Sequence, residues 1–434
     1  MTIVALSILL ALVGIVALRL AGFNYLGTQP HPLAFPIGMQ LLLVAIPGAL
    51  AVGLFHVPLT YDLHEEISAS VMQYGVVSTM ASIGVLLLML ALVFRTRILV
   101  PLRYQPSDDY MGPLRWLTAI SAVVLVVKLM AVSQIPLVLA IKGDVQGAAE
   151  AKVRILTNQE GVTAFGLNYI FRSYTSIVYL IALMGVAYDS GNKEKRRLLF
   201  WNLPLMVANA VYDVQKYTLV LLILLTFWVY YTRSGKARYI LQGALLGVVL
   251  SILMFVVTLG YDFDTELLQS TFYRLFVGQM EGMFFIYEFL KPNADYGWLG
   301  MPLAGMFRLP QIDPAADVVQ ILFPTAGDTW LNANTYYLAH AWTIFGPASI
   351  IVAPLFVVLN LVLMLRIAQP LVRAEPAIYL PVVLWQLARL PLVNIFTEFM
   401  YFKVALDFIL NLGFVWMIVS CVRSRTQTLE PSNS

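Results

Sequence analysis

The stretch VMQYGVVSTMASIGVLLLMLALVF, Val71–Phe94, carries no charged residue in 24 positions. A run of about 18 or more apolar residues can cross a bilayer as one helix. Comparable runs recur along the 434 residues, of which 60% are hydrophobic and only 12% charged. Only helices and closed barrels satisfy their backbone in lipid, and barrel strands alternate apolar and polar residues. The sequence therefore predicts an all-α polytopic membrane protein.

About eleven transmembrane helices are expected, in a single integral membrane domain covering residues 1–434. The expected spans are Thr2–Leu18, Ile37–Phe55, Val71–Phe94, Leu114–Val132, Leu167–Ala187, Leu198–Val211, Tyr217–Tyr231, Tyr239–Gly260, Ile344–Leu365, Ala377–Ile395 and Phe402–Val422. The single cysteine, Cys421, excludes an intrachain disulfide framework and a cysteine-rich metal site.

Clusters of basic residues orient these spans. If the spans alternate, every cluster falls on one side, which the positive-inside rule makes the cytoplasm. The clusters are Arg95, Arg97, Arg103 and Arg115; Lys193, Lys195, Arg196 and Arg197; Arg233, Lys236 and Arg238; Arg366 and Arg373; and Arg423 and Arg425. Two large loops, residues 133–166 and 261–343, then face outward. Loops of this length in a compact fold are usually functional.

Arg389 lies well inside the apolar segment Ala377–Ile395, where an ionisable side chain is expensive and indicates a functional site. The positions three and four residues before and after Arg389, which would lie next to it on a helix, carry no charged residue. Its counter-charge must come from another helix, from Glu398 or from a ligand, and the most natural ligand is a lipid phosphate. Pro391 is expected to kink or end the helix beside it.

Other outward cations extend this hypothesis. Arg154 stands near the end of a predicted outer helix, Ala148–Leu156, and Arg172 lies at the outer end of the span Leu167–Ala187. Two guanidinium groups at one helix entry suit a diphosphate. The alternative for Arg172, and for Lys128, is snorkelling to the lipid headgroups. Lys216 opens a short span, although an ion pair with Asp213 three residues earlier would also explain it.

The second outer loop contains a predicted helix, Phe272–Leu290. Arg274, Gly278, Glu281 and Glu288 share one of its faces, which would look into a cavity or form a solvated ion pair. In the last span, Lys403 and Asp407 stand four residues apart, and this spacing predicts an intramembrane ion pair.

Four stretches in this order resemble segments of the Wzy-type polymerases, which join O-antigen or oligosaccharide repeat units. They are Ala148–Arg154 (AAEAKVR), Asp213–Tyr217 (DVQKY), Tyr273–Phe276 (YRLF), and Asn332–Tyr337 (NANTYY) with Phe345–Gly346. Together they cover roughly residues 130–370. The chain departs from the family pattern at Gln215–Lys216, where a Gly-Arg pair is frequent, and at Ser349, where a second glycine is expected.

The resemblance implies an inverting glycosyltransferase with a helical fold related to the GT-C class and to the O-antigen ligases. Its donor and acceptor would be undecaprenyl-diphosphate-linked oligosaccharides, joined into O-antigen, capsule or exopolysaccharide at the periplasmic face of the bacterial inner membrane. Fixed cations would stabilise the diphosphate leaving group, so no metal or cofactor is expected. Membrane lipids and a chain-length regulator are further candidate partners, and no nucleic acid is expected.

These implications give each candidate residue a role. The diphosphate-binding set is Arg154, Arg172, Lys216, Arg274 and Arg389. The candidates for the catalytic base that deprotonates the acceptor hydroxyl are Glu281, Asp328, Glu398 and His340. Candidate glycan contacts are Asn332, Asn334 and Tyr337. The alternative functions are an O-antigen ligase, which transfers glycan to lipid A-core, and a polytopic transporter or flippase, which would show repeat symmetry.

Overall fold

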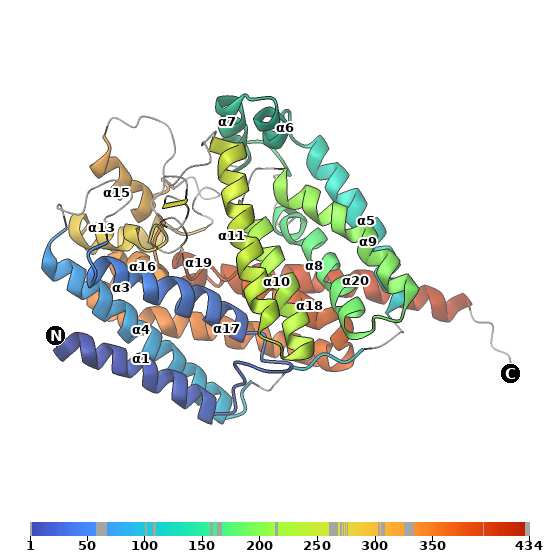
Figure 1. The fold of residues 1–434 in the computed structure, drawn as a ribbon, viewed down its shortest axis with the longest axis horizontal. Coiled ribbons are helices and arrows are strands. Elements are labelled where there is room, and N and C mark those ends of the chain that lie inside the picture. The colour runs from blue at the N-terminus through green and yellow to red at the C-terminus, as the bar shows by residue number, and fades with distance from the viewer. Residues whose placement is uncertain are drawn as a thin grey trace.

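The computed structural model describes residues 2–57, 67–99, 102–106, 110–156, 159–162, 167–212, 216–259, 268–269, 271, 273, 275, 277–302, 304, 309–324, 334–393 and 395–429. Within these ranges every element is a helix, which confirms the all-α prediction (Figure 1). In the first half, the helices are α1 Thr2–Leu20, α2 Ala34–Pro36, η1 Ile37–Ala45, α3 Ile46–Gly53, α4 Ala69–Arg95, α5 Met111–Met130, α6 Pro136–Ile141, α7 Val145–Leu156, α8 Leu167–Tyr188, α9 Lys193–Val211 and α10 Lys216–Ser234.

The second half is also helical. It contains α11 Arg238–Leu259, α13 Glu281–Phe289, α14 Asp295–Trp298, α15 Pro314–Leu322, α16 Tyr337–Phe345, η4 Gly346–Ala348, α17 Ser349–Ala374, α18 Pro376–Ala388, α19 Thr397–Met400 and α20 Lys403–Leu429. In Figure 1, α6 and α7 lie at the top, α15 lies at the upper left, and the turn between α10 and α11 lies in the lower half.

Eight described helical segments are long and apolar enough to cross a membrane, so the chain is a multi-pass membrane protein. They are Thr2–Leu20, Ala34–Gly53, Ala69–Arg95, Met111–Met130, Leu167–Tyr188, Tyr217–Ser234, Tyr337–Ala374 and Lys403–Ser424. The other three expected spans also coincide with helices. Two of them coincide with the apolar helices α11 and α18, of which α18 has only 13 residues, and the third is α9, which begins with a charged turn.

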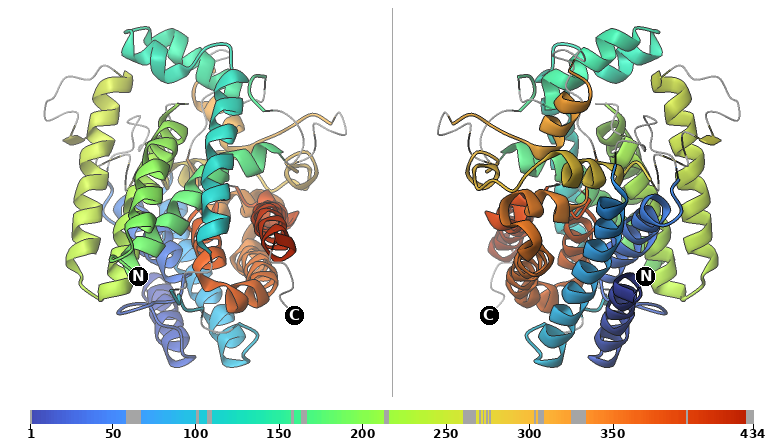
Figure 2. Two further views of the ribbon diagram at one scale, coloured as in Figure 1. Left: turned by 90° about the vertical axis from the view of Figure 1, so that its right-hand side faces the viewer. Right: turned by 90° about the vertical axis from the view of Figure 1, so that its left-hand side faces the viewer.

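The interior of the bundle is built around α8. Every residue from Ser173 to Gly185 is buried, as expected for a helix that is apolar on all sides. It packs against α5, α9, α10, α18 and α20. By contrast, α11 lies at the edge of the molecule in both views of Figure 2, and its exposed leucines suit a lipid-facing surface. Several helices therefore hold α8 in place, and its first turns carry Tyr169 and Ser173 of the polar site described below.

Helices α1 and α4 run side by side and pack closely. A Cβ atom added at Gly84 would lie 2.9 Å from the backbone of Leu10, so only glycine allows this approach. Small residues at such contacts are typical of membrane helices, because backbone packing replaces the hydrophobic effect there.

Three expected segments have different boundaries in the structure. The segment Ala377–Ile395 is not one helix, because α18 ends at Ala388 and Pro391 follows. The predicted helix Phe272–Leu290 is interrupted by a turn over residues 277–280, and α13 begins only at Glu281. The span Ile344–Leu365 begins in a turn, because Gly346 ends α16 with φ of 57° and α17 starts at Ser349.

The two large loops contain short helices that contact other helices of the chain. In the first loop, α7 confirms the helix expected over Ala148–Leu156, and α6 contacts both α7 and α11. In the second loop, α13 packs against α4, α15 and α16.

Candidate functional site

Arg389 stands at the C-terminal end of α18. The helix ends at Ala388 and Arg389 is its C-cap residue. Gln40, which extends from η1, donates a hydrogen bond from Nε2 to the oxygen of Ala388 over 3.2 Å. A helix C-terminus carries partial negative charge, so a cation is favourable at this point. The sequence placed Arg389 in mid-segment; the structure corrects this to a helix end close to other helices.

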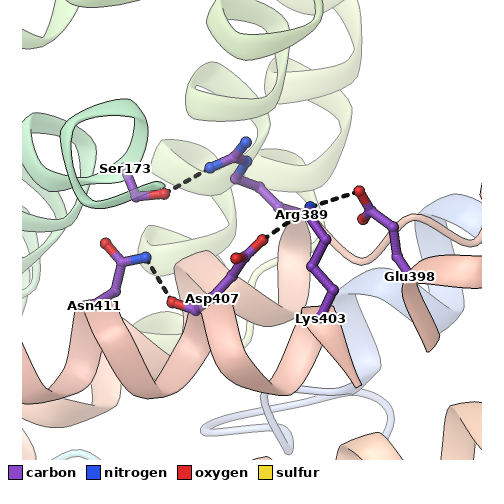
Figure 3. A network of polar contacts seen from close by, with 6 residues as sticks. All are labelled: Ser173, Arg389, Glu398, Lys403, Asp407 and Asn411. Atoms are coloured by element: carbon purple, nitrogen blue, oxygen red, sulfur yellow. Dashed lines mark hydrogen bonds and ion pairs between the residues drawn. The ribbon is translucent and has the colours of Figure 1, made fainter. Parts of the chain in front are cut away.

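The Arg389 guanidinium has neutral contacts. Its Nη1 donates a 2.6 Å hydrogen bond to Oγ of Ser173 on α8, and its Cζ lies 5.4 Å from the centre of the Trp385 ring (Figure 3). No carboxylate in the described ranges lies within 4.0 Å of it as an ion-pair partner. Its charge is thus not cancelled by direct contact with an acid. A partly buried cation without an acidic partner destabilises the protein. Its presence therefore indicates a functional role.

A second polar cluster faces this arginine, as Figure 3 shows. Nζ of Lys403 lies 2.6 Å from Oε1 of Glu398 and 3.3 Å from Oδ2 of Asp407. The expected Lys403–Asp407 ion pair is therefore confirmed, and Glu398 is an additional, closer partner. Nζ of Lys403 also lies 4.8 Å from the centre of the Tyr169 ring. The cluster carries one net negative charge, from two carboxylates and one ammonium group, and both carboxylates act electrostatically on Arg389.

The start of α8 joins the two clusters. Tyr169, Arg172 and Ser173 follow spacings of three and four residues and lie on one helix face. Tyr169 contacts Lys403, while Ser173 binds Arg389. Arg172 lies between them in sequence and interacts electrostatically with Arg389. Counting Arg172, Arg389 and Lys403 against the two carboxylates, this region has a net charge of +1.

Arg172 itself is exposed, and within the described part of the chain it makes no hydrogen bond or ion pair. It lines a small pocket together with Lys128 and Glu160. Lys128 does not snorkel to the membrane surface, contrary to one expectation. It is 7% exposed, donates a hydrogen bond to Asn209 and lies 4.3 Å from the centre of the Tyr212 ring.

Arg154 is engaged by a nearby acid. Its Nε lies 2.9 Å from Oε1 of Glu160, and Glu160 also accepts hydrogen bonds from the backbone N–H of Ser133 over 3.0 Å and from its Oγ over 2.8 Å. These contacts fasten the end of α7 to the end of α5. The proposed role of Arg154 in binding a diphosphate would require exchange of Glu160 for the ligand.

We expect Glu160→Gln to loosen this connection, with faster hydrogen exchange of the Ser133 and Gly161 amides. Hydrogen bonds from Ser133 hold the pKa of Glu160 below its usual 4.5, and Arg154 adds to this. A lowered carboxylate pKa stabilises the folded state above the unfolded pKa, and the effect is lost as the pH falls through the folded value. Wild-type protection should therefore persist from pH 8 to 5, as measured by exchange mass spectrometry, and fall only under more acidic conditions. Equal exchange in wild type and Glu160→Gln at pH 7 would contradict this account.

The candidate catalytic bases differ in their surroundings. Of the candidates that the structure describes, Glu398 is the only one that belongs to the Lys403 cluster, where it pairs with Lys403 and acts electrostatically on Arg389. His340 on α16 is buried, and its Nε2 has no hydrogen-bond partner among the described residues, although Glu398 acts on it electrostatically. Glu281 is buried at the start of α13. Asp328 lies outside the described residues.

The Asn-rich segment is joined to both regions. The backbone oxygen of Asn334 accepts a 3.1 Å hydrogen bond from Gly282, and the N–H of Tyr337 donates a 3.0 Å bond to Leu392. This brings α13, α16 and the segment after Arg389 together. Asn334 is exposed, so a glycan could reach it, whereas Tyr337 is buried and its hydroxyl lies 3.0 Å from Oγ of Ser82.

Besides Asp328, three expected residues remain without a structural test. Arg274 and Asn332 lie outside the described residues, and for Lys216 the structure describes only the backbone, which begins α10 as predicted. Sequence reasoning missed Tyr169, Ser173 and Trp385. Their signal was present for α8, since Tyr169 and Ser173 share a helix face with Arg172.

No protein-family model, curated protein or solved structure matches this chain. The resemblance to the polymerases therefore stays a prediction carried by the four quoted stretches.

Proposed function

We propose that the chain is an inverting glycosyltransferase that polymerises undecaprenyl-diphosphate-linked repeat units. It would act at the periplasmic face of the bacterial cytoplasmic membrane, with about eleven transmembrane helices and a GT-C-like architecture. The observation that carries this proposal is Arg389, a partly buried guanidinium that contacts a hydroxyl and an indole ring and has no carboxylate partner among the described residues. Arg172 repels Arg389 electrostatically, and a bound anion would relieve the repulsion between these two cations.

The chemistry of transfer fits such a site. When the anomeric carbon is attacked, negative charge develops on the departing diphosphate oxygen. Cations held in place before the reaction stabilise that charge, because they need no reorganisation as it forms. Guanidinium is suited to this role by its planar fork of donors, which matches phosphate oxygens. Arg389 and Arg172 are therefore the central diphosphate ligands, with Arg154, Lys216 and Arg274 as further members of the set.

The acceptor hydroxyl needs a base within hydrogen-bond reach. Glu398 is the preferred candidate because it acts electrostatically on Arg389 and contacts the Lys403 cluster. In this arrangement the ion pair with Lys403 fixes the position of Glu398. Glu281, Asp328 and His340 are the alternatives.

The orientation is supported by contacts among the basic segments. Arg115 at the start of α5 pairs with Glu194 at the start of α9, and Arg423 near the C-terminus pairs with Glu375 between α17 and α18. These contacts join segments that the positive-inside rule assigns to the cytoplasm. Arg389 follows the opposite end of α18, which would then face the periplasm.

Deletion of the gene in its host should collapse the ladder of surface polysaccharide chain lengths to core plus a single unit. The physical reason is that single units can still be ligated when polymerisation is lost. The measurement is gel electrophoresis of the surface polysaccharide, with plasmid complementation as the control. Complete loss of attached polysaccharide would favour the ligase, and an unchanged ladder would exclude both enzymes.

A further inference from the structure

A polar pocket of about 360 Å³ lies where three segments meet, far in sequence from Arg389. Its lining comes from the connection between α1 and α2, from the end of α4 with the segment after it, and from the end of α10. The lining includes His31, Thr28, Arg103 and Arg233 and contains no carboxylate from the described residues. Both arginines belong to the basic clusters assigned to the cytoplasm.

The connection between α1 and α2 is held in a defined shape. Gly22, Gly27 and Gln29 have positive φ angles, of 91°, 99° and 49°. Such a conformation is unusual for Gln29 and persists only when the surroundings impose it. The N–H of Gly27 donates to the Tyr231 hydroxyl over 2.7 Å, and the N–H of Gln29 donates to the oxygen of Thr232 over 2.8 Å. The pocket is thus a built feature rather than a gap between loose loops.

His31 provides a donor at the buried end of the pocket. It is 4% exposed, and its ring contacts those of Phe23 and Phe94, with centroid distances of 5.2 and 5.0 Å. Its Nδ1 accepts a 3.2 Å hydrogen bond from the N–H of Leu33, so in the neutral ring the proton resides on Nε2. That Nε2 has no hydrogen-bond partner among the described residues.

Burial lowers the pKa of His31 to about 3, so the imidazole is neutral at physiological pH. An unpaired buried N–H group destabilises the protein, and this cost is removed when a ligand accepts the hydrogen bond. Arg103 and Arg233 are exposed, and in the part of the chain that the structure describes neither forms an ion pair. The pocket therefore combines two available guanidinium groups with one buried neutral donor.

We propose that this pocket binds a phosphate group on the cytoplasmic side, a site separate from the one around Arg389. Two guanidinium groups and an N–H donor match the several acceptor oxygens of a phosphate, and no lining carboxylate among the described residues opposes it. The phosphate could belong to a soluble phosphate compound or to the headgroup of an anionic lipid, because both occur at the cytoplasmic surface. The proposal does not depend on the glycosyltransferase function.

The test uses the purified full-length protein and two probes. In one arm, inorganic phosphate is titrated into protein held in phosphatidylcholine nanodiscs, with isothermal titration calorimetry as the readout. In the other, retention of phosphatidylglycerol against phosphatidylcholine is measured by native mass spectrometry in detergent. Arg103→Gln and Arg233→Gln should each weaken binding about tenfold or more. His31→Phe keeps the aromatic packing but removes the donor, and should weaken binding about fivefold.

Lys236→Gln is the matched control, because Lys236 is an exposed cation of the same segment that does not line the pocket. Selective loss in the phosphate arm identifies a soluble ligand, and selective loss in the lipid arm identifies a headgroup. The proposal is overturned if neither probe binds wild type, or if Lys236→Gln weakens binding as much as Arg103→Gln and Arg233→Gln. Circular dichroism of each variant confirms folding, and the two arginine variants test the pocket independently.

Discussion

Replacing Arg389 with alanine is expected to lower the rate of glycan transfer by about 10²–10³-fold, the cost of removing one preorganised charge-stabilising group. The variant should reproduce the collapsed polysaccharide ladder of the gene deletion while protein abundance stays normal. The reason is that Arg389 would face the departing diphosphate with a charge that no described carboxylate neutralises by contact. Polysaccharide gels and transfer assays with lipid-linked repeat units measure the effect.

Related variants distinguish the contribution of the positive charge of Arg389 from that of its hydrogen-bond geometry. Arg389→Lys keeps the charge but loses the donor fork and should recover only part of the activity. Ser173→Ala leaves the arginine in place without its 2.6 Å hydrogen bond and should cost about tenfold. Arg373→Ala changes an exposed arginine at the end of α17 and should leave the ladder intact. A full ladder in Arg389→Ala at normal abundance would refute the proposed role.

Arg154→Ala and Arg274→Ala are predicted to collapse the ladder as well, if these residues bind the same diphosphate. For Arg154 the comparison with Glu160→Gln is decisive. Glu160→Gln releases the guanidinium from its acid, so a ligand-binding Arg154 keeps its activity in that variant. If both variants lose activity equally, Arg154 acts by holding the loop.

The second large effect is expected on stability. Lys403→Met should lower the free energy of unfolding by about 3 kcal/mol, because it leaves the carboxylates of Glu398 and Asp407 close together and partly buried without their shared cation. The three side chains are between 16% and 22% exposed, so water compensates only in part. Thermal unfolding of the purified protein in detergent should show a lower midpoint.

Neutralising the carboxylates tests this explanation. The triple variant Lys403→Met, Glu398→Gln, Asp407→Asn removes the uncompensated charges and should regain most of the lost stability. Lys142→Met, which changes an exposed lysine in the first outer loop, should unfold at the wild-type midpoint. If the triple variant unfolds no higher than Lys403→Met, the loss comes from packing around the lysine stem and not from unpaired charge.

Much of the fold could be predicted because membrane helices leave a strong local signal. Runs of apolar residues located a helix at each of the eleven expected spans, and eight described segments are long and apolar enough to cross a membrane. The spacing within one helix predicted the Lys403–Asp407 pair. Pro391 was correctly interpreted as a residue that ends regular helix, since α18 stops at Ala388. Each of these features is determined by residues that lie close together in the sequence.

The candidate site was harder to predict, because its contacts join residues far apart in sequence. Nothing near Arg389 in the chain indicates that Ser173 binds it, 216 positions away. The partner of Arg154 was likewise set by how the loop folds back, which places Glu160 beside both Arg154 and Ser133. The sequence shows that a cation lies in an apolar segment, where burying its charge is unfavourable. Only the folded structure shows which side chains from other helices contact that charge.

The π-helix η1 has a consequence for how insertions and deletions would act on this protein. Each π turn contains about one residue more than an α turn, so the nine residues Ile37–Ala45 follow a wider spiral. Gln40 lies on that spiral and holds the last carbonyl of α18, directly before Arg389. Loss of one residue from this stretch would rotate Gln40 away from α18 while leaving the segment apolar. The period of a lipid-embedded helix near the N-terminus thus sets the alignment of a charged group almost 350 residues later.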